Sequence, residues 1–217
     1  VTGDGSVTIH IPEWNEQYHS RHGAIAEALH VFIANGLVHI LKDIDSSPLH
    51  LLEIGFGTGL NAFLTLAASL NNTVTVHYTG IEAYPVVPSE IENLNYAELV
   101  DGSADDFRRL HTAPWEVWAK ISPNFHLRKK KQYFVDIKAQ NAYHLIYFDA
   151  FGARVQPELW TVTIFQRMFE ALMPGGVLVT YAAKGSVRRA MQEVGFTVER
   201  LPGPPGKREM LRATKPK

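Results

Sequence analysis

The sequence predicts an α/β fold, in which strands and helices alternate along the chain and pack as layers. Apolar and β-branched runs of strand length alternate with stretches of helical spacing. A glycine-rich turn, with glycine at positions 55, 57 and 59, follows the first strong apolar run. With 217 residues, 46% of them hydrophobic, the chain is long enough for one ordinary domain with a proper core.

The chain divides into an N-terminal extension, residues 1–47, and a main domain, residues 48–217. The extension is expected to form a short hairpin followed by a helix. That helix has an apolar face, which we expect to pack on the main domain. The residues of this face are Ala24, Ala28, Leu29, Val31 and Phe32.

The main domain is expected to alternate strands with helices and to close with an antiparallel pair over residues 196–214. The expected strands cover residues 49–55, 74–83, 131–139, 143–151 and 174–183. The expected helices cover residues 59–70, 88–99, about 101–122, 157–173 and 186–194. Ser89 and Glu92 suggest a capping box for the second helix, and Pro157 suits the first turn of the fourth.

The glycine-rich turn is expected to hold a ligand that is poor in phosphate. A dinucleotide fingerprint would need glycine where Leu60 stands, and a P-loop would need a lysine that is absent after the turn. The carboxylate of Glu53, two residues before Gly55, should repel phosphates. S-adenosylmethionine fits because it offers a ribose diol, an ammonium and a sulfonium. A tight strand–helix connection without a ligand is the alternative.

Three acidic residues at or near strand ends are candidates for the same ligand. Glu82 ends the second strand, where a carboxylate commonly binds ribose hydroxyls. Asp136, at the third expected strand, could take the adenine amino group. Asp149 ends the fourth strand, at the crevice mouth where ligands of open α/β sheets bind. Taken singly, Glu82 and Asp136 also fit ordinary surface residues, but the combination with the glycine turn favours a cofactor site.

Composition excludes several classes of protein. The formal net charge is −1, so no global basic field indicates nucleic acid. Cysteine is absent, which excludes disulfides, thiolate catalysis and cysteine-bound zinc. His19 and His22 lack a third ligand and a HExxH frame, so no metal is expected. Without a membrane-spanning stretch or a signal peptide, we expect no membrane partner and a cytoplasmic location.

Five segments together resemble the MnmD family of methyltransferases, which also forms the N-terminal half of the bifunctional MnmC enzymes. They are EIGFGTGLN, YTGIEAYP, YFDAFGARVQPELWT, MPGGVLVTYAAKGSVRRAMQEVGF and GKREML. The resemblance runs from about Asp4 to Met210 and implies a class I S-adenosylmethionine-dependent methyltransferase fold, mostly parallel with a reversed final strand. It implies methyl transfer to the aminomethyl nitrogen of 5-aminomethyl-(2-thio)uridine at the tRNA wobble position, giving 5-methylaminomethyl-(2-thio)uridine.

The resemblance carries over the glycine turn with Glu53 and Asn61, the ribose-binding Glu82, and the pair Asp149 and Phe151. With Asp136 added from the strand ends, the expected cofactor-binding residues are Glu53, Gly55, Phe56, Gly57, Gly59, Asn61, Glu82, Asp136 and Asp149. Bifunctional relatives tend to read DGFAPAKNPEMW where this chain reads DAFGARVQPELW. The chain ends before a flavin-dependent half, so we expect it not to convert a carboxymethylaminomethyl precursor by itself.

Asp149 is the candidate catalytic residue. An aliphatic amine is largely protonated near neutral pH, so a group that accepts hydrogen bonds from it and draws off a proton is needed. Phe151 either stacks on the flipped-out uracil or is buried under its loop. Tyr18 and Ser20, in the extension, are expected to cover the cofactor and border the substrate.

Basic residues gather in three stretches, at residues 128–131, at 184–189 and at Lys207 and Arg208. Such clusters usually lie on solvated turns and helix faces. Lys207, Arg208 and residues 128–131 are nevertheless the candidates for contacting tRNA phosphates, which would make binding salt-dependent.

Three other functions fit parts of the pattern. A methyltransferase of the same fold could act on a small amine or a protein. A non-catalytic module could use the fold as an interaction surface, although intact glycines and acids argue against such decay. A nicotinamide oxidoreductase is disfavoured by Leu60 and Glu53.

Overall fold

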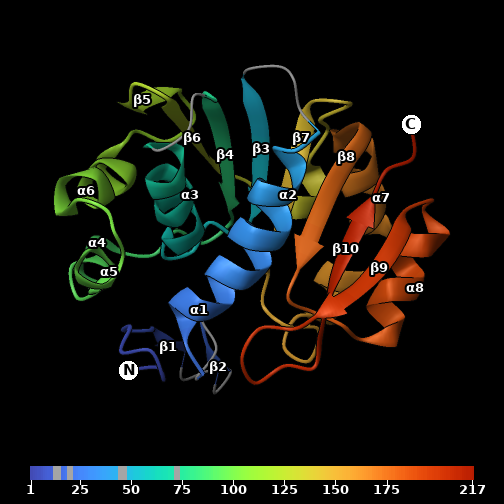
Figure 1. Cartoon of the computed structure of the whole chain (residues 1–217), viewed down its shortest axis with the longest axis horizontal. Helices are drawn as coiled ribbons and strands as arrows, with labels where there is room; N and C mark the ends of the chain where they lie inside the picture. The colour runs from blue at the N-terminus through green and yellow to red at the C-terminus, as the bar shows by residue number, and fades with distance from the viewer. Residues whose placement is uncertain (12–15, 19–21, 44–47, 71–73) are drawn as a thin grey trace.

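An eight-stranded mixed sheet forms the centre of the molecule in the computed structural model (Figure 1). The structure describes residues 1–11, 16–18, 22–43, 48–70 and 74–217. Within these residues, no helix is both long and apolar enough to cross a membrane.

The strand order is β5-β6-β4-β3-β7-β8-β10-β9. The strands are β3 Leu49–Ile54, β4 Val76–Glu82, β5 Ala119–Ser122, β6 Phe125–Lys131, β7 Tyr143–Phe148, β8 Leu172–Thr180, β9 Thr197–Pro202 and β10 Glu209–Thr214. The five neighbouring strands β6, β4, β3, β7 and β8 run parallel. Strand β10 pairs antiparallel with both β8 and β9. The predicted α/β class and the closing antiparallel pair are therefore confirmed.

The extension forms the expected hairpin and helix. Strands β1 (His10–Ile11) and β2 (Glu16–Gln17) pair antiparallel. A continuous helix follows, composed of α1 (Ala24–Ala28), the π-helical η2 (Leu29–Leu37) and α2 (Val38–Ile40). This helix crosses the sheet over β7 and β8 (Figure 1). It lies close to the sheet at Gly36, where a Cβ would come within 3.0 Å of the Val179 side chain.

Helices cover both faces of the sheet. The helix of the extension, α3 (Leu60–Leu70) and α6 (Ala104–Thr112) pack on one face, where Phe63 and Tyr147 are fully buried. Helices α7 (Val162–Ala171) and α8 (Gly185–Glu193) pack on the other face, around Phe148 and Phe165. Burying large apolar side chains on both faces explains the continuous apolar runs of the central strands.

The region between β4 and β7 differs from the expectation. Residues 88–99 form two short helices, α4 (Pro88–Ile91) and α5 (Tyr96–Leu99), and Val87 begins α4 without a side-chain cap, so the predicted capping box is wrong. The helix expected over residues 101–122 ends at Thr112, because the sequence Ala113-Pro114 disfavours helical backbone before the proline. Strand β5 follows it.

The third parallel strand was predicted too late in the chain. It is β6, over residues 125–131, whereas Phe134–Asp136 form a short 3₁₀ turn, η3. Alternate β6 residues are buried, but the third of them is Lys129, whose charge conceals the strand period. The helix expected from Pro157 likewise begins as a 3₁₀ turn, η4 (Pro157–Trp160), before α7.

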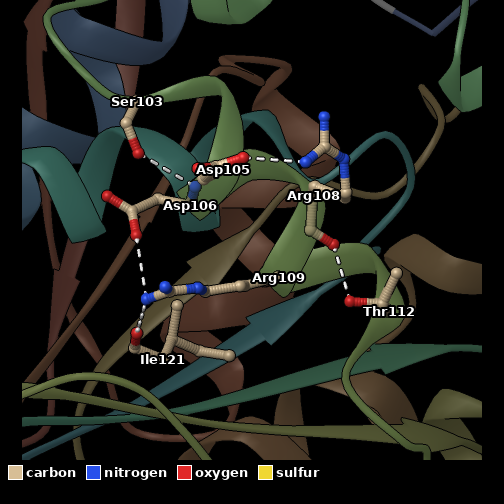
Figure 2. A network of polar contacts seen from close by, with 7 residues as sticks. All are labelled: Ser103, Asp105, Asp106, Arg108, Arg109, Thr112 and Ile121. Atoms are coloured by element: carbon tan, nitrogen blue, oxygen red, sulfur yellow. Dashed lines mark hydrogen bonds and ion pairs between the residues drawn. The ribbon is translucent and has the colours of Figure 1, made fainter.

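Polar contacts connect α6 to the edge of the sheet (Figure 2). The Ser103 side chain caps α6 by accepting a hydrogen bond from the Asp106 backbone N–H at 3.0 Å. Arg109 lies near the Asp106 carboxylate at 3.7 Å and donates to the backbone carbonyl of Ile121 in β5 at 3.4 Å. These contacts position α6 beside the edge strand.

Four histidines lie side by side on adjacent parallel strands. His144, His50, His77 and His126 belong to β7, β3, β4 and β6, and their ring centroids are 5.7, 5.1 and 5.0 Å apart in that order. Burial, followed by the neighbouring histidines, lowers the pKa of His50 and His77, and burial lowers the pKa of His144. His50, His77 and His144 should therefore resist protonation in the folded state.

We expect His50, His77 and His144 to contribute a decrease in the free energy of unfolding as the pH falls below 6.5, the ordinary histidine pKa, because the unfolded chain binds protons that these folded histidines resist. The raised pKa values of Glu53 and Asp149 act in the opposite direction, so the contribution is measured as the difference between each variant and the wild type. His77→Gln should lessen this decrease, and His10→Gln, outside the row, should not. Urea unfolding at about pH 8 and about pH 5.5 measures the difference. The same change in the free energy of unfolding between the two pH values in the His77 variant and the wild type would contradict the explanation.

Candidate functional site

A cleft of about 910 Å³ opens at the carboxyl ends of the central strands. It lies where the strand order reverses between β3 and β7, the position at which open α/β sheets bind ligands. The glycine turn after β3, the ends of β4 and β7, the extension and the β9–β10 loop all contribute to its wall. Elements distant in the sequence therefore meet at one site.

The glycine turn needs its glycines. Gly55, Gly57 and Gly59 have φ values of +88°, +48° and +73°, which side chains rarely adopt. A Cβ on Gly55 would lie 2.8 Å from the backbone oxygen of Asp149, so the turn packs directly against the end of β7. Phe56 lines the cleft with its ring mostly buried.

Asn61, at the start of α3, joins the ends of the two central strands. Its Nδ2 donates hydrogen bonds to Glu53 Oε1 at 2.9 Å and to Asp149 Oδ2 at 2.8 Å. Asn61 and Glu53 are buried, with 3% and 1% of their surface exposed. The amide thereby fixes the position of the Asp149 carboxyl group in the cleft.

Burial controls the charge of these acids. It raises the pKa of Glu53 well above its usual range. For Asp149, burial and then the negative charge of Glu27 outweigh the Asn61 hydrogen bond and the positive charge of Lys207, raising the pKa to about 7. Asp149 can therefore exchange a proton near neutral pH.

Glu82 supports the glycine turn from the end of β4. Its Oε2 accepts a hydrogen bond from the Gly57 backbone N–H and its Oε1 accepts one from the Tyr84 backbone N–H, both at 3.0 Å. Burial raises the pKa of this carboxyl group, although these backbone hydrogen bonds oppose the shift. The Ala83 backbone N–H also bonds this carboxyl group, and three such bonds leave one of its four lone pairs for a hydroxyl group on a ligand.

Two aromatic residues predicted to border the ligands meet in the structure. Tyr18 and Phe151 both line the cleft, and their rings pack edge to face with centroids 5.0 Å apart. Phe151 is half-buried, between the two alternatives that the sequence left open. Burial, with Glu82 and Glu90, raises the pKa of Tyr18 to about 12, so its hydroxyl stays protonated. Ser20 lies outside the described residues.

The cleft contains an ion pair that the sequence did not suggest. Glu27 of α1 lies 2.7 Å from Nζ of Lys207 in the β9–β10 loop, and both residues line the cleft. Lys207 was expected on the surface against tRNA, whereas its Nζ lies over the Tyr181 ring at 4.0 Å. The sequence signal for this ion pair was a single acid, Glu27, among the apolar residues of α1.

Two charged stretches lie in elements other than those expected. Asp136 is exposed in η3 and is not among the described residues that line the cleft, although its neighbours Phe134 and Val135 are. The basic stretch 128–131 is a strand and not a solvated turn or helix face. Its Lys129 is 2% exposed and donates to the His111 carbonyl at 2.6 Å, and burial lowers its pKa to about 8.

Arg208 lies beside the cleft and not in it. It lines a second groove of about 520 Å³ together with Arg154 and Lys184, and Lys207 lines both hollows. Gly152 and Tyr181 are also shared, so the two hollows adjoin each other. The described residues contain no group of three or more potential ligands that could hold a metal ion.

The cleft suits S-adenosylmethionine. Gly55 and Gly57 line the cleft, so a ligand there meets main chain that carries no side chain. Glu53, Glu82 and Asp149 are among the lining residues, and carboxyl groups match hydroxyl, ammonium and sulfonium groups. Among the described lining residues, only Lys207 is basic, so the cleft offers little to a string of phosphates.

The strand order, the glycine turn after β3 and the reversed strand β10 define a class I S-adenosylmethionine-dependent methyltransferase fold. Residues 122–216 match the family described as S-adenosyl-L-methionine-dependent methyltransferase. Two relatives are bifunctional tRNA 5-methylaminomethyl-2-thiouridine biosynthesis proteins MnmC. That of Cupriavidus necator is 29% identical over 94% of this chain and 32% of its own length. That of Burkholderia mallei is 27% identical over 96% of this chain and 34% of its own length.

Solved structures show the same fold. MnmC2 from Aquifex aeolicus has a TM-score of 0.77 and 24% identity, covering 100% of this chain and 70% of that one. Spermidine synthase from Thermotoga maritima has a TM-score of 0.55 and 14% identity, covering 97% of this chain and 68% of that one. The resemblance to MnmD-type methyltransferases and the predicted cofactor class are confirmed. The chain spans about a third of the length of the MnmC relatives.

We expect Gly55→Ala to weaken S-adenosylmethionine binding by about tenfold or more, because the positive φ and the contact with Asp149 force the turn to move. Gly152→Ala is the matched control, since its Cβ would meet nothing nearer than the Tyr181 hydroxyl at 3.7 Å. Calorimetric titration measures both affinities, with thermal unfolding to check the fold. Wild-type affinity in the Gly55 variant would contradict the role of the turn.

Proposed function

We propose that this protein transfers a methyl group from S-adenosylmethionine to the aminomethyl nitrogen of 5-aminomethyl-(2-thio)uridine at the tRNA wobble position. The observation that carries this proposal is the Asp149 carboxyl group, held by Asn61 beside the glycine turn with a pKa of about 7. The names of the MnmC relatives support tRNA as the substrate. The product is the 5-methylaminomethyl nucleoside.

The cofactor would lie along the glycine turn. Glu82 would accept hydrogen bonds from its ribose hydroxyls, and Gly55, Gly57 and Gly59 would let its main body approach the backbone. Glu53 and Asn61 would act indirectly, by fixing the end of β3 and the position of the Asp149 carboxyl group. We treat residues 1–47 as part of the catalytic unit, since Tyr18 and Glu27 line the cleft.

The reaction mainly requires that the amine be positioned and lose a proton. S-adenosylmethionine supplies a methyl group already activated by its sulfonium. The chain must therefore hold the amine in line and remove a proton from it. Asp149 would accept a hydrogen bond from the amine, aim its lone pair and take up the proton, for which a pKa near the working pH is well suited.

The uridine and its strand would lie outside the cofactor. Phe151, which packs against Tyr18 and is partly exposed, would stack on the flipped-out base. Arg208 and Lys207 would face the phosphates from the adjoining groove. Ser20 belongs to the proposed substrate border by its place in the sequence.

Labelled S-adenosylmethionine and tRNA carrying wobble 5-aminomethyluridine test the reaction. After incubation, digestion and nucleoside identification, the label should appear in 5-methylaminomethyluridine. Label in another nucleoside, or in a small amine or protein offered instead of the tRNA, would reject the proposed substrate. Wild-type tRNA without the aminomethyl group is the negative control.

We expect Asp149→Asn to lower kcat by about 100-fold, while S-adenosylmethionine affinity changes far less. The variant keeps an acceptor for the Asn61 amide but loses the proton acceptor. In the ligand-free wild type, Asp149 is protonated below its pKa of about 7, so kcat/KM for S-adenosylmethionine should fall as the pH drops through that value. Rates and calorimetric affinities measured together decide the role: equal losses in both would make Asp149 a cofactor ligand only.

A further inference from the structure

We propose that Glu27 recognises the positive charge of the substrate amine, and that Lys207 is the partner which the amine replaces. The proposal rests on the function proposed above and concerns residues that the predicted site did not contain. Glu27 lies in the extension, in the same cleft as Asp149, and its side chain is 13% exposed. A carboxylate so placed needs a positive partner.

The charges in the cleft make this exchange specific. The described lining residues include the acids Glu27, Glu53, Glu82, Asp149 and Glu158. Lys207 is the only basic residue among them. A positively charged amine that enters can pair with Glu27 in its place, whereas a neutral group cannot.

Glu27 and Lys207 both act on the catalytic carboxyl group. The negative charge of Glu27 contributes to the raised pKa of Asp149, and the positive charge of Lys207 opposes it. The ion pair therefore lies within electrostatic range of the position where the amine must sit. Glu27 on one side and Asp149 on the other would hold the amine between two acceptors.

The Lys207 side chain can also interact with ligands in the adjoining groove. It lines the adjoining groove as well as the cleft, and that groove is also lined by Arg154, Lys184 and Arg208. Phosphates of an RNA strand in the groove would attract the lysine that leaves Glu27. Binding of the amine in the cleft and of phosphates in the groove would thus assist each other.

The pair is also suited to exchange by its surroundings. The Lys207 side chain is 31% exposed, more than that of Glu27, and its Nζ rests on the face of the Tyr181 ring at 4.0 Å. The lysine lies in the β9–β10 loop, while Glu27 is fixed on a helix packed against the sheet. Lys207 is therefore the member of the pair that can move.

Binding of two RNAs tests the exchange. One is a tRNA with wobble 5-aminomethyluridine and the other is the same tRNA with unmodified uridine, both measured with S-adenosylhomocysteine present. The wild type should prefer the aminomethyl tRNA by about tenfold or more. Glu27→Gln should reduce the preference to about twofold or less, because the amide offers the ammonium no charge.

Lys207→Met should separate the two roles. It should weaken binding of both tRNAs and lower the slope of log affinity against log salt by about 1, while the preference for the amine stays at least as large. Glu98→Gln, an exposed change on α5 outside both hollows, is the control for loss of one negative charge and should match the wild type.

The outcomes distinguish this inference from the proposed function. If the wild type does not methylate the aminomethyl tRNA, the proposed function fails. If it does, but Glu27→Gln keeps the wild-type preference, the exchange is wrong. Should the single variant fold poorly, Glu27→Gln combined with Lys207→Met leaves neither charge unpaired and must still lose the preference. An equal drop in affinity for both tRNAs in Glu27→Gln would show a structural role only.

Discussion

One side-chain amide, that of Asn61, joins the ends of the two strands on which the site is built. Its hydrogen bonds to Glu53 and Asp149 link β3 and β7 at the point where the strand order reverses. The glycine turn lies against the same strand end, because Gly55 leaves no room for a Cβ beside the Asp149 carbonyl. The shape of the turn and the position of the proposed catalytic carboxyl group therefore depend on each other.

Burial makes the charge of the acids in this arrangement sensitive to a ligand beside them. The pKa values of Glu53, Glu82 and Asp149 are all raised mainly by burial. A positive ligand favours the ionised form of such acids, and in a site of low polarity that attraction is stronger than in water. From the sequence, the charge of Glu53 was expected to exclude phosphates. Glu53 is 1% exposed and burial raises its pKa, so we expect exclusion to come instead from the scarcity of basic groups among the described residues of the cleft.

Local sequence was sufficient for the central strands and for the turn. The run before Gly55 and the run ending at Asp149 are buried on both faces, which makes them continuously apolar and easy to identify. Their acidic ends followed from the rule that parallel strands present their carboxyl ends to one crevice. Glu82 was found in the same way, although its hydrogen bond to Gly57 could not be seen without the fold.

Long-range contacts explain what sequence reasoning missed. Lys129 occupies an inward position of β6 because the His111 carbonyl, 18 residues earlier in the chain, accepts its hydrogen bond. Asp136 was assigned to adenine only because its strand was placed about one element too late. Glu27 meets Lys207 across nearly the whole chain, and no spacing in the sequence reports such a contact.

The most direct test of the account is the carboxyl carbon NMR titration of Asp149. In the free protein the group should titrate near pH 7, far above its ordinary value of 3.8. S-adenosylmethionine should lower that pKa more than S-adenosylhomocysteine does, because only the former carries a sulfonium charge. Titration near 3.8, or the same pKa with both ligands, would contradict a buried carboxyl group facing the methyl donor.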